Sequence, residues 1–270
     1  MEIKLVNYSS KKYNVLIEEK ITGITGSNKK SFVDLLSLNK LEEGDIYINN
    51  IKVTDNNLRV LKKRIGLVDN RETPAFINTV YDYILESIKR DNISIKESNK
   101  RIRDSFKIVG IPIYYLERNY YSLSTTEKKL VELMICLIPN PTIIILNNFF
   151  QGIDLKTEKR IIMLLRKIKE QYKKTIIISD NNAEILYKYT DKMIFIKNNK
   201  IFYEGDTKET YEHVDYLNRS KFTIPDIVLF TSIAKKKKEV KIDYHNDIRD
   251  IIKDIYKHVN IGEWYYAFFN

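Results

Sequence analysis

The stretch K-I-T-G-I-T-G-S-N-K-K-S, residues 20–31, decides the fold of this chain. A short apolar strand leads into it and a helix with periodic apolar residues follows, as in the phosphate-binding loop G-x-x-x-x-G-K-[ST]. Gly23 and Lys29 stand at the spacing that this pattern requires. Asn28 replaces its second glycine, and Lys30 replaces the hydroxyl residue that holds Mg²⁺. Backbone N–H groups at a helix N-terminus and a lysine still attract phosphate, so the stretch predicts a phosphate site that has lost its metal ligand.

The candidate nucleotide-binding residues are those of the loop and the first turn of its helix: Gly23, Gly26, Ser27, Asn28, Lys29, Lys30 and Ser31. Two other interpretations of the loop stay open. A strand, turn and helix that bind no ligand have the same local pattern. A shift of one place makes Lys30 and Ser31 the lysine–hydroxyl pair, but it loses the spacing from Gly23.

Composition places the chain among globular proteins of one or two domains, with 270 residues, 43% hydrophobic and 30% charged. The net charge of +10 would suit nucleic acid or an anionic membrane surface. No basic stripe with interleaved aromatics occurs, however, so solvated lysine faces explain the charge and no nucleic-acid partner is expected. The single cysteine, Cys136, excludes an internal disulfide and indicates a reducing compartment. The sequence has no signal peptide and no run of roughly 18 apolar residues, so any membrane-spanning part would come from a partner.

Apolar periodicity predicts an α/β core with crossover connections. In the N-terminal part we expect strands at residues 1–6, 13–17, 20–22, 41–48 (a turn and a strand), 51–53 and 65–68, and a helix at 58–63. The spacing of the first two strands suggests a small antiparallel sheet. From 79 to 137 the spacing becomes helical, which predicts an inserted helical region. The chain then alternates between strands at 142–147, 175–179, 192–197 and 200–203 and helices at 156–172 and 183–189.

The order of these parts resembles the ATP-binding subunit of an ABC transporter, most of all the A-component ATPases of energy-coupling-factor importers. The resemblance covers residues 1 to about 206. It implies an α/β P-loop ABC-ATPase fold with an antiparallel β subdomain, an inserted helical subdomain at about 76–138 and a small C-terminal extension. The corresponding domains are 1–215, which would bind nucleotide, and 216–270, which resembles the family's dimerisation domain.

The resemblance also shows which functional residues are substituted. Asn70 stands for the glutamine that joins the metal site and senses the helical subdomain. The signature L-S-G-G-Q is L-S-T-T-E at residues 123–127, so Ser124 is kept while both glycines are lost. Glu127 is expected to add a negative charge that faces phosphate.

The residues that would handle Mg²⁺ and water are substituted as well. Asn147 stands for the aspartate that orients Mg²⁺, and Asn148 for the glutamate that acts as general base. An amide cannot accept a proton from water, so no catalytic residue and no metal site are expected. Asp154 is kept in the loop G-I-D, and Asp180 replaces the switch histidine. Tyr13 either stacks on adenine or is a plain strand residue.

The loss of these groups predicts that ATP, if it binds, does so without Mg²⁺. Lys29 and Lys30 would then share the phosphates as charged donors. The simpler alternative is that Lys30 points to solvent from the first turn of its helix.

The C-terminal part is predicted to hold two ATPase subunits together, as the resemblance implies. A last core helix is expected at 207–213, a second helix begins within 222–227, and a third covers 243–259. Isoleucines 248, 251, 252 and 255 would share one face of the third helix, beyond a basic run at 235–238. The aromatic tail at 264–269 is either an ordered packing element or an interaction patch.

The whole sequence therefore predicts a non-hydrolysing ABC-type subunit at the cytoplasmic face of the membrane. Its partners would be a second ABC ATPase subunit with intact motifs and an integral membrane component of the transporter. One alternative is a competent importer ATPase whose paired chain supplies the missing groups. The other is a soluble regulatory or scaffold protein that keeps only the fold.

Overall fold

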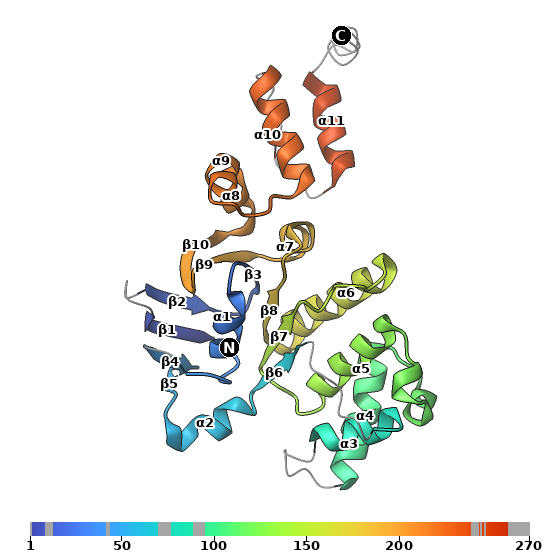
Figure 1. Cartoon of the computed structure of the whole chain (residues 1–270). Coiled ribbons are helices and arrows are strands. Elements are labelled where there is room, and N and C mark those ends of the chain that lie inside the picture. Colours follow the sequence, from blue (N-terminus) through green and yellow to red (C-terminus); the bar gives the residue numbers. More distant parts are fainter. Residues whose placement is uncertain are drawn as a thin grey trace.

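The computed structural model describes residues 2–8, 13–41, 44–69, 77–88, 95–238, 243, 245 and 247–258. Two sheets, a helical insert and a C-terminal group of helices make up these residues (Figure 1). Asn70 and the aromatic tail at 264–269 lie outside the described residues. The helix predicted at 243–259 lies partly outside them. The α/β architecture expected from the sequence is confirmed.

The larger sheet has six strands in the order β10-β9-β3-β8-β7-β6. Its strands are β3 (Ile21–Gly26), β6 (Ile65–Val68), β7 (Ile143–Asn147), β8 (Thr175–Ser179), β9 (Lys192–Lys197) and β10 (Lys200–Asp206). All pairs are parallel except β9 and β10, which form a hairpin at the edge. Every residue of β7 and β8 is buried, as their near-continuous apolar sequences predict for parallel strands covered on both faces.

The two faces of this sheet support two hydrophobic cores, because successive side chains of a strand point to opposite sides. Ile143 and Ile145 of β7 pack with α1 (Lys29–Leu36) and the small antiparallel sheet. Ile144 and Leu146 pack instead with the helical insert and α6 (Leu155–Tyr172). Strand β7 therefore contributes side chains to both hydrophobic cores, and it ends at the candidate site.

The small sheet is antiparallel, in the order β2-β1-β4-β5. Its strands are β1 (Ile3–Tyr8), β2 (Tyr13–Ile17), β4 (Asp45–Ile48) and β5 (Ile51–Lys52). Asn49 and Asn50 have φ of 50° and 63°, the left-handed pair that a two-residue hairpin turn requires. The short helix α2 (Asp55–Lys62) follows β5.

The helical insert contains α3 (Val80–Ile88), α4 (Ile95–Val109), the short 3₁₀ turns η2 (Ile113–Glu117) and η3 (Tyr120–Ser122), and α5 (Thr125–Leu137). It lies beside the β6 edge of the large sheet, at the lower right of Figure 1. Ile84 of α3, Phe106 of α4 and Met134 of α5 are buried in its core. The predicted helical structure is therefore confirmed at Val80–Ile88, Ile95–Val109 and Thr125–Leu137, while residues 89–94 lie outside the described part of the chain.

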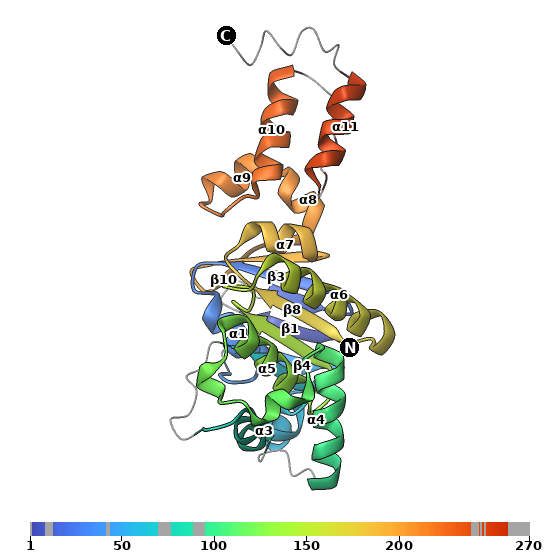
Figure 2. The same ribbon diagram turned by 90° about the vertical axis from the view of Figure 1, so that its right-hand side faces the viewer.

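The C-terminal helices extend away from the large sheet (Figures 1 and 2). After α7 (Ala183–Tyr189) and the β9–β10 hairpin come α8 (Thr207–Glu212), α9 (Val214–Arg219), α10 (Asp226–Lys238) and α11 (Ile248–His258). Ile251 of α11 is fully buried against Ala234 and Ile227 of α10, whereas Ile248 is 59% exposed and Ile252 43% exposed. The helix pair therefore covers only part of the predicted isoleucine face.

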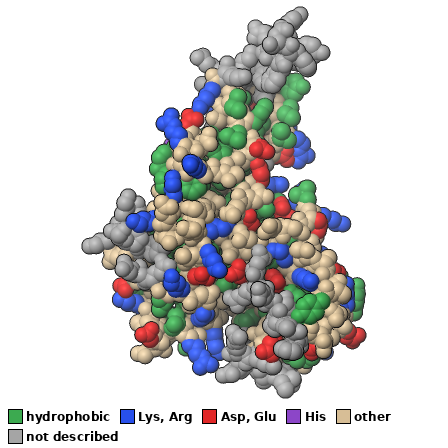
Figure 3. All heavy atoms as spheres, in the orientation of Figure 1, with side chains coloured by type: hydrophobic (Ala, Val, Ile, Leu, Met, Phe, Trp, Pro, Cys, Tyr) green, Lys and Arg blue, Asp and Glu red, His purple; other side chains and the backbone are tan. Residues whose placement is uncertain are grey.

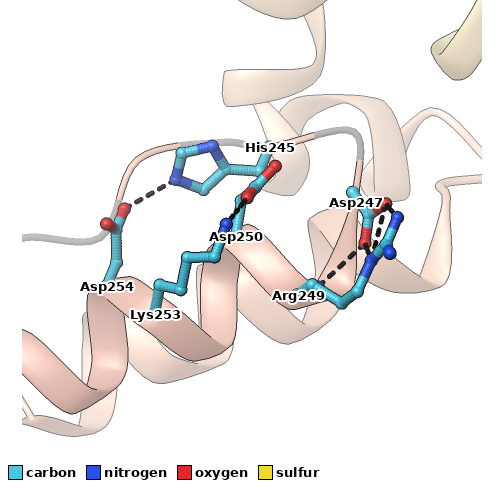
Figure 4. A network of polar contacts seen from close by, with 6 residues as sticks. All are labelled: His245, Asp247, Arg249, Asp250, Lys253 and Asp254. Carbon is cyan, nitrogen blue, oxygen red and sulfur yellow. Dashed lines mark hydrogen bonds and ion pairs between the residues drawn. The ribbon is translucent and has the colours of Figure 1, made fainter.

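Polar contacts organise the start of α11 (Figure 4). The His245 Nε2 atom lies 2.6 Å from Asp254 Oδ2, and the Arg249 guanidinium pairs with Asp247. Tyr187 of α7 donates a hydrogen bond of 3.4 Å to the His245 carbonyl, which connects this segment to the core.

Several predicted element ends were wrong. Strand β3 runs on to Gly26 instead of ending at residue 22, because it pairs with β9 as far as Ile196. Helix α2 begins at Asp55, three residues early, because the Asn57 side chain accepts the Thr54 N–H at 2.8 Å. Strand β10 continues to Asp206 along β9, and α11 begins at Ile248. Helix α9 was not predicted, and it spans the predicted domain boundary between residues 215 and 216. The division into these two domains stays a prediction.

Candidate nucleotide-binding site

The candidate site lies at the carboxyl ends of the parallel strands, where open α/β sheets bind ligands. The loop after β3 meets the residues that follow β7 and β8. The Asp180 N–H donates to the Ile24 carbonyl at 3.0 Å, and the Asn148 N–H donates to the Ser179 carbonyl at 2.7 Å. These backbone bonds bring residues from distant parts of the sequence to one edge.

The backbone of the loop keeps the conformation for which its pattern uses glycine. Gly26 has φ of 119°, and a Cβ there would lie 1.9 Å from the Ile196 carbonyl oxygen. Asn28, which replaces the second glycine, has φ of 59° and ψ of 24°. Asparagine is one of the few residues with a side chain that enter this left-handed region readily. The substitution at Asn28 therefore leaves the turn into α1 intact.

Lys29 is buried at the start of α1, with only 7% of its surface exposed. Its ammonium donates a hydrogen bond of 3.1 Å to Asn148 Oδ1. Burial lowers the pKa of Lys29 to about 8, and the nearby charge of Asp180 opposes this shift. Asn148 is a neutral partner, so it offsets the cost of burying the charge less than a carboxylate would.

The neighbouring residues of the first turn are more accessible. Lys30 is exposed and Ser31 is half-buried. Ser27 Oγ accepts the Asn198 N–H at 3.4 Å, which holds the loop against the β9–β10 turn. The Tyr13 side chain lies outside the described part of the chain, so its predicted roles stay predictions.

A second buried lysine, Lys129 of α5, meets the same asparagine. Its Nζ donates to the Asn148 carbonyl oxygen at 3.1 Å, and 7% of its surface is exposed. Burial lowers its pKa, while Glu132 and Asp180 raise it. The sequence analysis missed Lys129, because a lysine in a charged helical segment looks like a surface residue. The only signal was its place two residues past the altered signature motif, next to the apolar run that begins at Leu130.

The amide of Asn147 is buried at the end of β7 and donates to Asp69 Oδ1 at 3.0 Å. Its own Oδ1 is buried and has no hydrogen-bond partner among the described residues. Asp69 directly precedes Asn70, the predicted counterpart of the metal-site glutamine. Asn147 stands where the family has the aspartate that orients Mg²⁺. Its amide instead donates a hydrogen bond to the neighbouring Asp69 carboxylate.

The carboxylate of Asp180 is fixed on one side only. Oδ1 accepts the backbone N–H groups of Asn181 and Asn182 at 2.8 and 2.9 Å. Oδ2 is buried and has no hydrogen-bond partner within the described chain, and the residue is 6% exposed. Its charge acts on both Lys29 and Lys129.

The side chains present fit phosphate better than Mg²⁺. The loop backbone and Lys29 keep a phosphate-binding arrangement. Hard oxygen ligands for Mg²⁺ are depleted, since amides stand at Asn147 and Asn148 and an ammonium at Lys30. Among the described residues, no group of three or more His, Cys, Asp or Glu side chains could hold a metal ion.

The signature segment is organised differently from what we expected. Ser124 caps α5, its Oγ accepting the Glu127 N–H at 3.3 Å while Glu127 Oε2 accepts the Ser124 N–H at 2.8 Å. Glu127 Oε1 accepts hydrogen bonds from the Tyr115 hydroxyl at 2.6 Å and the Arg118 guanidinium at 2.7 Å. These contacts, the Tyr115 bond first, lower the pKa of Glu127 to about 2. Both oxygens of Glu127 thus accept hydrogen bonds within its own subdomain. The expectation that its charge faces phosphate stays a prediction.

Asp154 has a local structural role in this structure. Its Oδ1 accepts the Thr157 N–H at 2.9 Å and caps α6. The preceding Gly152 has φ of 79°, and its carbonyl lies 3.5 Å from the Thr126 hydroxyl. The loop before α6 and the signature segment therefore touch within one chain.

The sequence matches the family described as ABC transporter over residues 16–151, half of the chain. With the P-loop fold and the ordered motif positions described above, this places the chain in the ABC transporter family. None of the described helices is long and apolar enough to cross a lipid bilayer.

Similar proteins agree with this assignment. The chain is 29% identical over 235 residues to the energy-coupling factor transporter ATP-binding protein EcfA2 of Caldanaerobacter subterraneus, covering 86% of this chain and 81% of that protein. It is 28% identical over 211 residues to EcfA1 of Staphylococcus aureus, covering 76% of each.

Solved structures share the fold. CbiO1 from Clostridium perfringens, part of the ABC transporter complex CbiONQ, has a TM-score of 0.67 at 22% identity and covers 85% of this chain and 98% of its own. A dimeric ATP-binding cassette bound to ADP and phosphate has a TM-score of 0.65 at 24% identity, with 76% and 98% covered. At this level of identity the likeness establishes the ABC-ATPase fold alone.

Proposed function

We propose that this chain is an ATP-binding-type subunit of an energy-coupling-factor importer that binds nucleotide but does not hydrolyse ATP. The relatives named EcfA1 and EcfA2 support the type of transporter. The observation that carries the loss of hydrolysis is Asn148, held between two buried lysines where the family has its general base. An amide cannot take the proton of an attacking water, and general-base catalysis typically contributes a factor of roughly 10² to 10⁴.

Retained nucleotide binding is supported by the cost of keeping Lys29 where it is. A buried lysine without a charged partner lowers the stability of the fold, and a bound anion would offset this cost. Gly26 and Asn28 meanwhile keep the backbone turn that points N–H groups of α1 toward an anion. The loop and Lys29 would hold the phosphates, with the exposed Lys30 as a second charged donor. Bound phosphate would give Lys29 a negatively charged partner, where its present hydrogen-bond partner Asn148 is neutral.

The hydrolysis test compares the purified chain with its Lys29→Ala variant and with a blank without enzyme. We expect ATP turnover no faster than the blank for both proteins. Turnover on the order of 1 s⁻¹ that disappears in Lys29→Ala would show a competent ATPase and overturn the proposal.

Mg²⁺ independence follows from the exchange of charges at the site. A working site balances Mg²⁺ against carboxylates, and here Asn147 and Asn148 have lost them while Lys30 has gained a charge. Titration with a fluorescent nucleotide analogue should give the same affinity in EDTA as in Mg²⁺. Nucleotide binding that becomes tenfold tighter on adding Mg²⁺ would contradict the proposed independence from Mg²⁺.

We also propose that the chain pairs with a second ABC ATPase subunit and, through an integral membrane component, works at the cytoplasmic face of the membrane. The relatives' names and the CbiONQ complex support this assembly. Hydrophobic side chains gather over α10 and α11 in Figure 3. The exposed large hydrophobic residues that the structure describes on these two helices are Phe230, Ile233, Ile248, Ile252 and Tyr256. A partner with intact motifs fits better than a second copy, because two copies would form two inactive sites.

The pairing test places charge on this apolar surface in the full chain. Ile248→Asp combined with Ile252→Asp should abolish co-purification with the ATPase partner. Val60→Asp is the matched control, since Val60 is 61% exposed on α2, away from these helices. Association unchanged by the double variant would show that the surface has another use.

A further inference from the structure

A fixed carboxylate lies beside the ammonium that would hold the phosphates. Asp180 follows β8 directly, and its N–H bond to Ile24 anchors it next to the start of the phosphate loop. The two backbone N–H groups on Oδ1 prevent the carboxylate from turning away. Its other oxygen, Oδ2, is buried on a residue that is 6% exposed and meets no donor among the described residues. A buried acceptor without a partner is costly, so its presence in a ligand site calls for a reason.

The charges near the loop are few and already partly balanced. Among the described residues, the buried cations near the loop are Lys29 and Lys129, and Asp180 acts on both. Glu132 also acts on Lys129, and burial raises the pKa of Glu132 to about 6, so it carries a charge at neutral pH. A diphosphate adds less negative charge than a triphosphate. In a solution without Mg²⁺, no divalent ion neutralises the difference.

The substitutions at Asn148 and Asp180 act in opposite directions on a third phosphate. Asn148 removes a carboxylate, which by itself would favour a triphosphate. Asp180 returns a carboxylate on the β8 side, within reach of the Lys29 charge. In a partly buried site, like charges repel far more strongly than in water. Two backbone N–H groups hold Oδ1 of this aspartate in place, which opposes movement of the carboxylate away from a ligand.

We infer that this site selects a nucleoside diphosphate over a nucleoside triphosphate, and that Asp180 is the residue that sets the preference. The inference rests on the proposed nucleotide binding at the loop and adds the number of phosphates. Such a subunit would hold ADP in its phosphate loop in preference to ATP. The Lys29 ammonium would bind the β-phosphate. Its hydrogen bond to Asn148 would either remain or be replaced by one to the phosphate.

The test measures the affinities of ADP and ATP for the full chain in EDTA by calorimetry. We expect the unmodified chain to bind ADP at least about tenfold more tightly than ATP. In Asp180→Asn the ATP affinity should rise until the two nucleotides bind about equally, because the amide keeps the Oδ1 acceptor and loses the charge. The ADP affinity should change little.

The matched control is Asp206→Asn. Asp206 Oδ1 likewise accepts a following backbone N–H, that of Lys208 at 2.9 Å, but it ends β10 at the opposite edge of the sheet. Its substitution should leave the ADP-to-ATP ratio unchanged. Repeating the unmodified chain at 0.5 M salt adds a measurement that needs no variant, and the ADP preference should shrink by no more than a few-fold because a buried charge is poorly screened.

The outcomes separate the two proposals. Binding of neither nucleotide overturns both the proposed nucleotide binding and the preference. ATP bound as tightly as ADP by the unmodified chain overturns the preference alone, even if Asp180→Asn does not fold. An ADP preference that survives in a folded Asp180→Asn shows that Asp180 is not its cause.

Discussion

In the phosphate loop a charged side chain is buried beside a neutral partner, whereas at the start of α5 a charged side chain is surrounded by donors. The Lys29 ammonium meets the amide oxygen of Asn148, and burial lowers its pKa to about 8. The Glu127 carboxylate receives hydrogen bonds from Tyr115, Arg118 and Ser124, and these lower its pKa to about 2. The first shift destabilises the folded charge at neutral pH, and the second stabilises it.

The two pKa shifts differ in their effect on stability. Burial of the Lys29 charge costs stability in the free chain, and a bound phosphate would offset that cost, while the hydrogen-bonded Glu127 charge stabilises the fold. The phosphate loop therefore remains a candidate binding site. The altered signature segment, in contrast, serves as the capped start of a helix.

Gly26→Ala should have the largest effect, because the loop side depends on its backbone. The added Cβ would meet the Ile196 carbonyl at 1.9 Å in a region of φ that alanine avoids. We expect a loss of more than about 3 kcal/mol in the free energy of unfolding, measured by urea denaturation.

Gly110→Ala is the control for Gly26→Ala, since Gly110 has φ of 74° but its nearest neighbour atom would lie 3.7 Å from a new Cβ. It should cost only about 1 kcal/mol of backbone strain. Equal costs at the two positions would show that the loop can relax around the clash.

Lys29→Met should reduce nucleotide affinity about 100-fold, because the point charge that meets the phosphates is removed. Calorimetric titration of the folded variant measures the loss. Lys30→Met, at the neighbouring exposed position, should weaken binding by no more than about tenfold. If both variants bind equally well, the buried lysine has no role in binding and the contrast fails.

Glu127→Ala should lower the free energy of unfolding by about 2 kcal/mol, since it removes the capping box and leaves Tyr115 and Arg118 without their acceptor. Glu97→Ala breaks an exposed ion pair with Arg101 and should cost only about 0.5 kcal/mol.

The contribution of Glu127 should also depend on pH. Its folded pKa is depressed below the ordinary value of 4.5, so the stabilisation by its charge is present above that value and is lost as the pH falls toward 2. The stability difference between the unmodified chain and Glu127→Gln should therefore shrink between pH 5 and pH 3. A difference that stays constant would mean that the charge does not matter.

Nucleotide affinity should fall about tenfold between pH 7 and pH 9. The ammonium form of Lys29 binds phosphate, and its lowered pKa of about 8 means that this form is lost as the pH rises through that value. Fluorescence titrations across this range give the profile. The Lys29→Met variant is the control, because its residual affinity should show no such fall.

Asn28→Gly should have the smallest effect, within about 0.5 kcal/mol of the unmodified stability, because both residues adopt the left-handed conformation. Asn28→Ala at the same φ of 59° should cost about 1 kcal/mol. Chemical denaturation of the unmodified chain and the two variants measures these differences in the free energy of unfolding. An alanine as stable as the glycine would show that the loop does not need this turn.

Local sequence patterns determined most of the fold. The strands β2, β6, β8 and β9 and the helix α7 have the predicted bounds, because apolar runs between turn residues define them without distant contacts. The family and its degenerate motifs could also be identified from the ordered positions of the loop, the signature and the strand before Asn147. These features depend on residue type and spacing, which the chain carries in every conformation.

The tertiary structure decided which charged residues are buried and what they meet. Lys129 looked like a surface lysine and proved to be a buried partner of Asn148, and Glu127, which is expected to face phosphate, also caps α5. Lys29 and Asn148 are 119 positions apart, so no local pattern could show their bond or the lowered pKa. The Asp180 oxygen that meets no donor among the described residues is likewise buried only after β8 packs beside β3. The sequence fixes which charges are available, and packing alone sets their desolvation and their neighbours, on which the chemistry of the site depends.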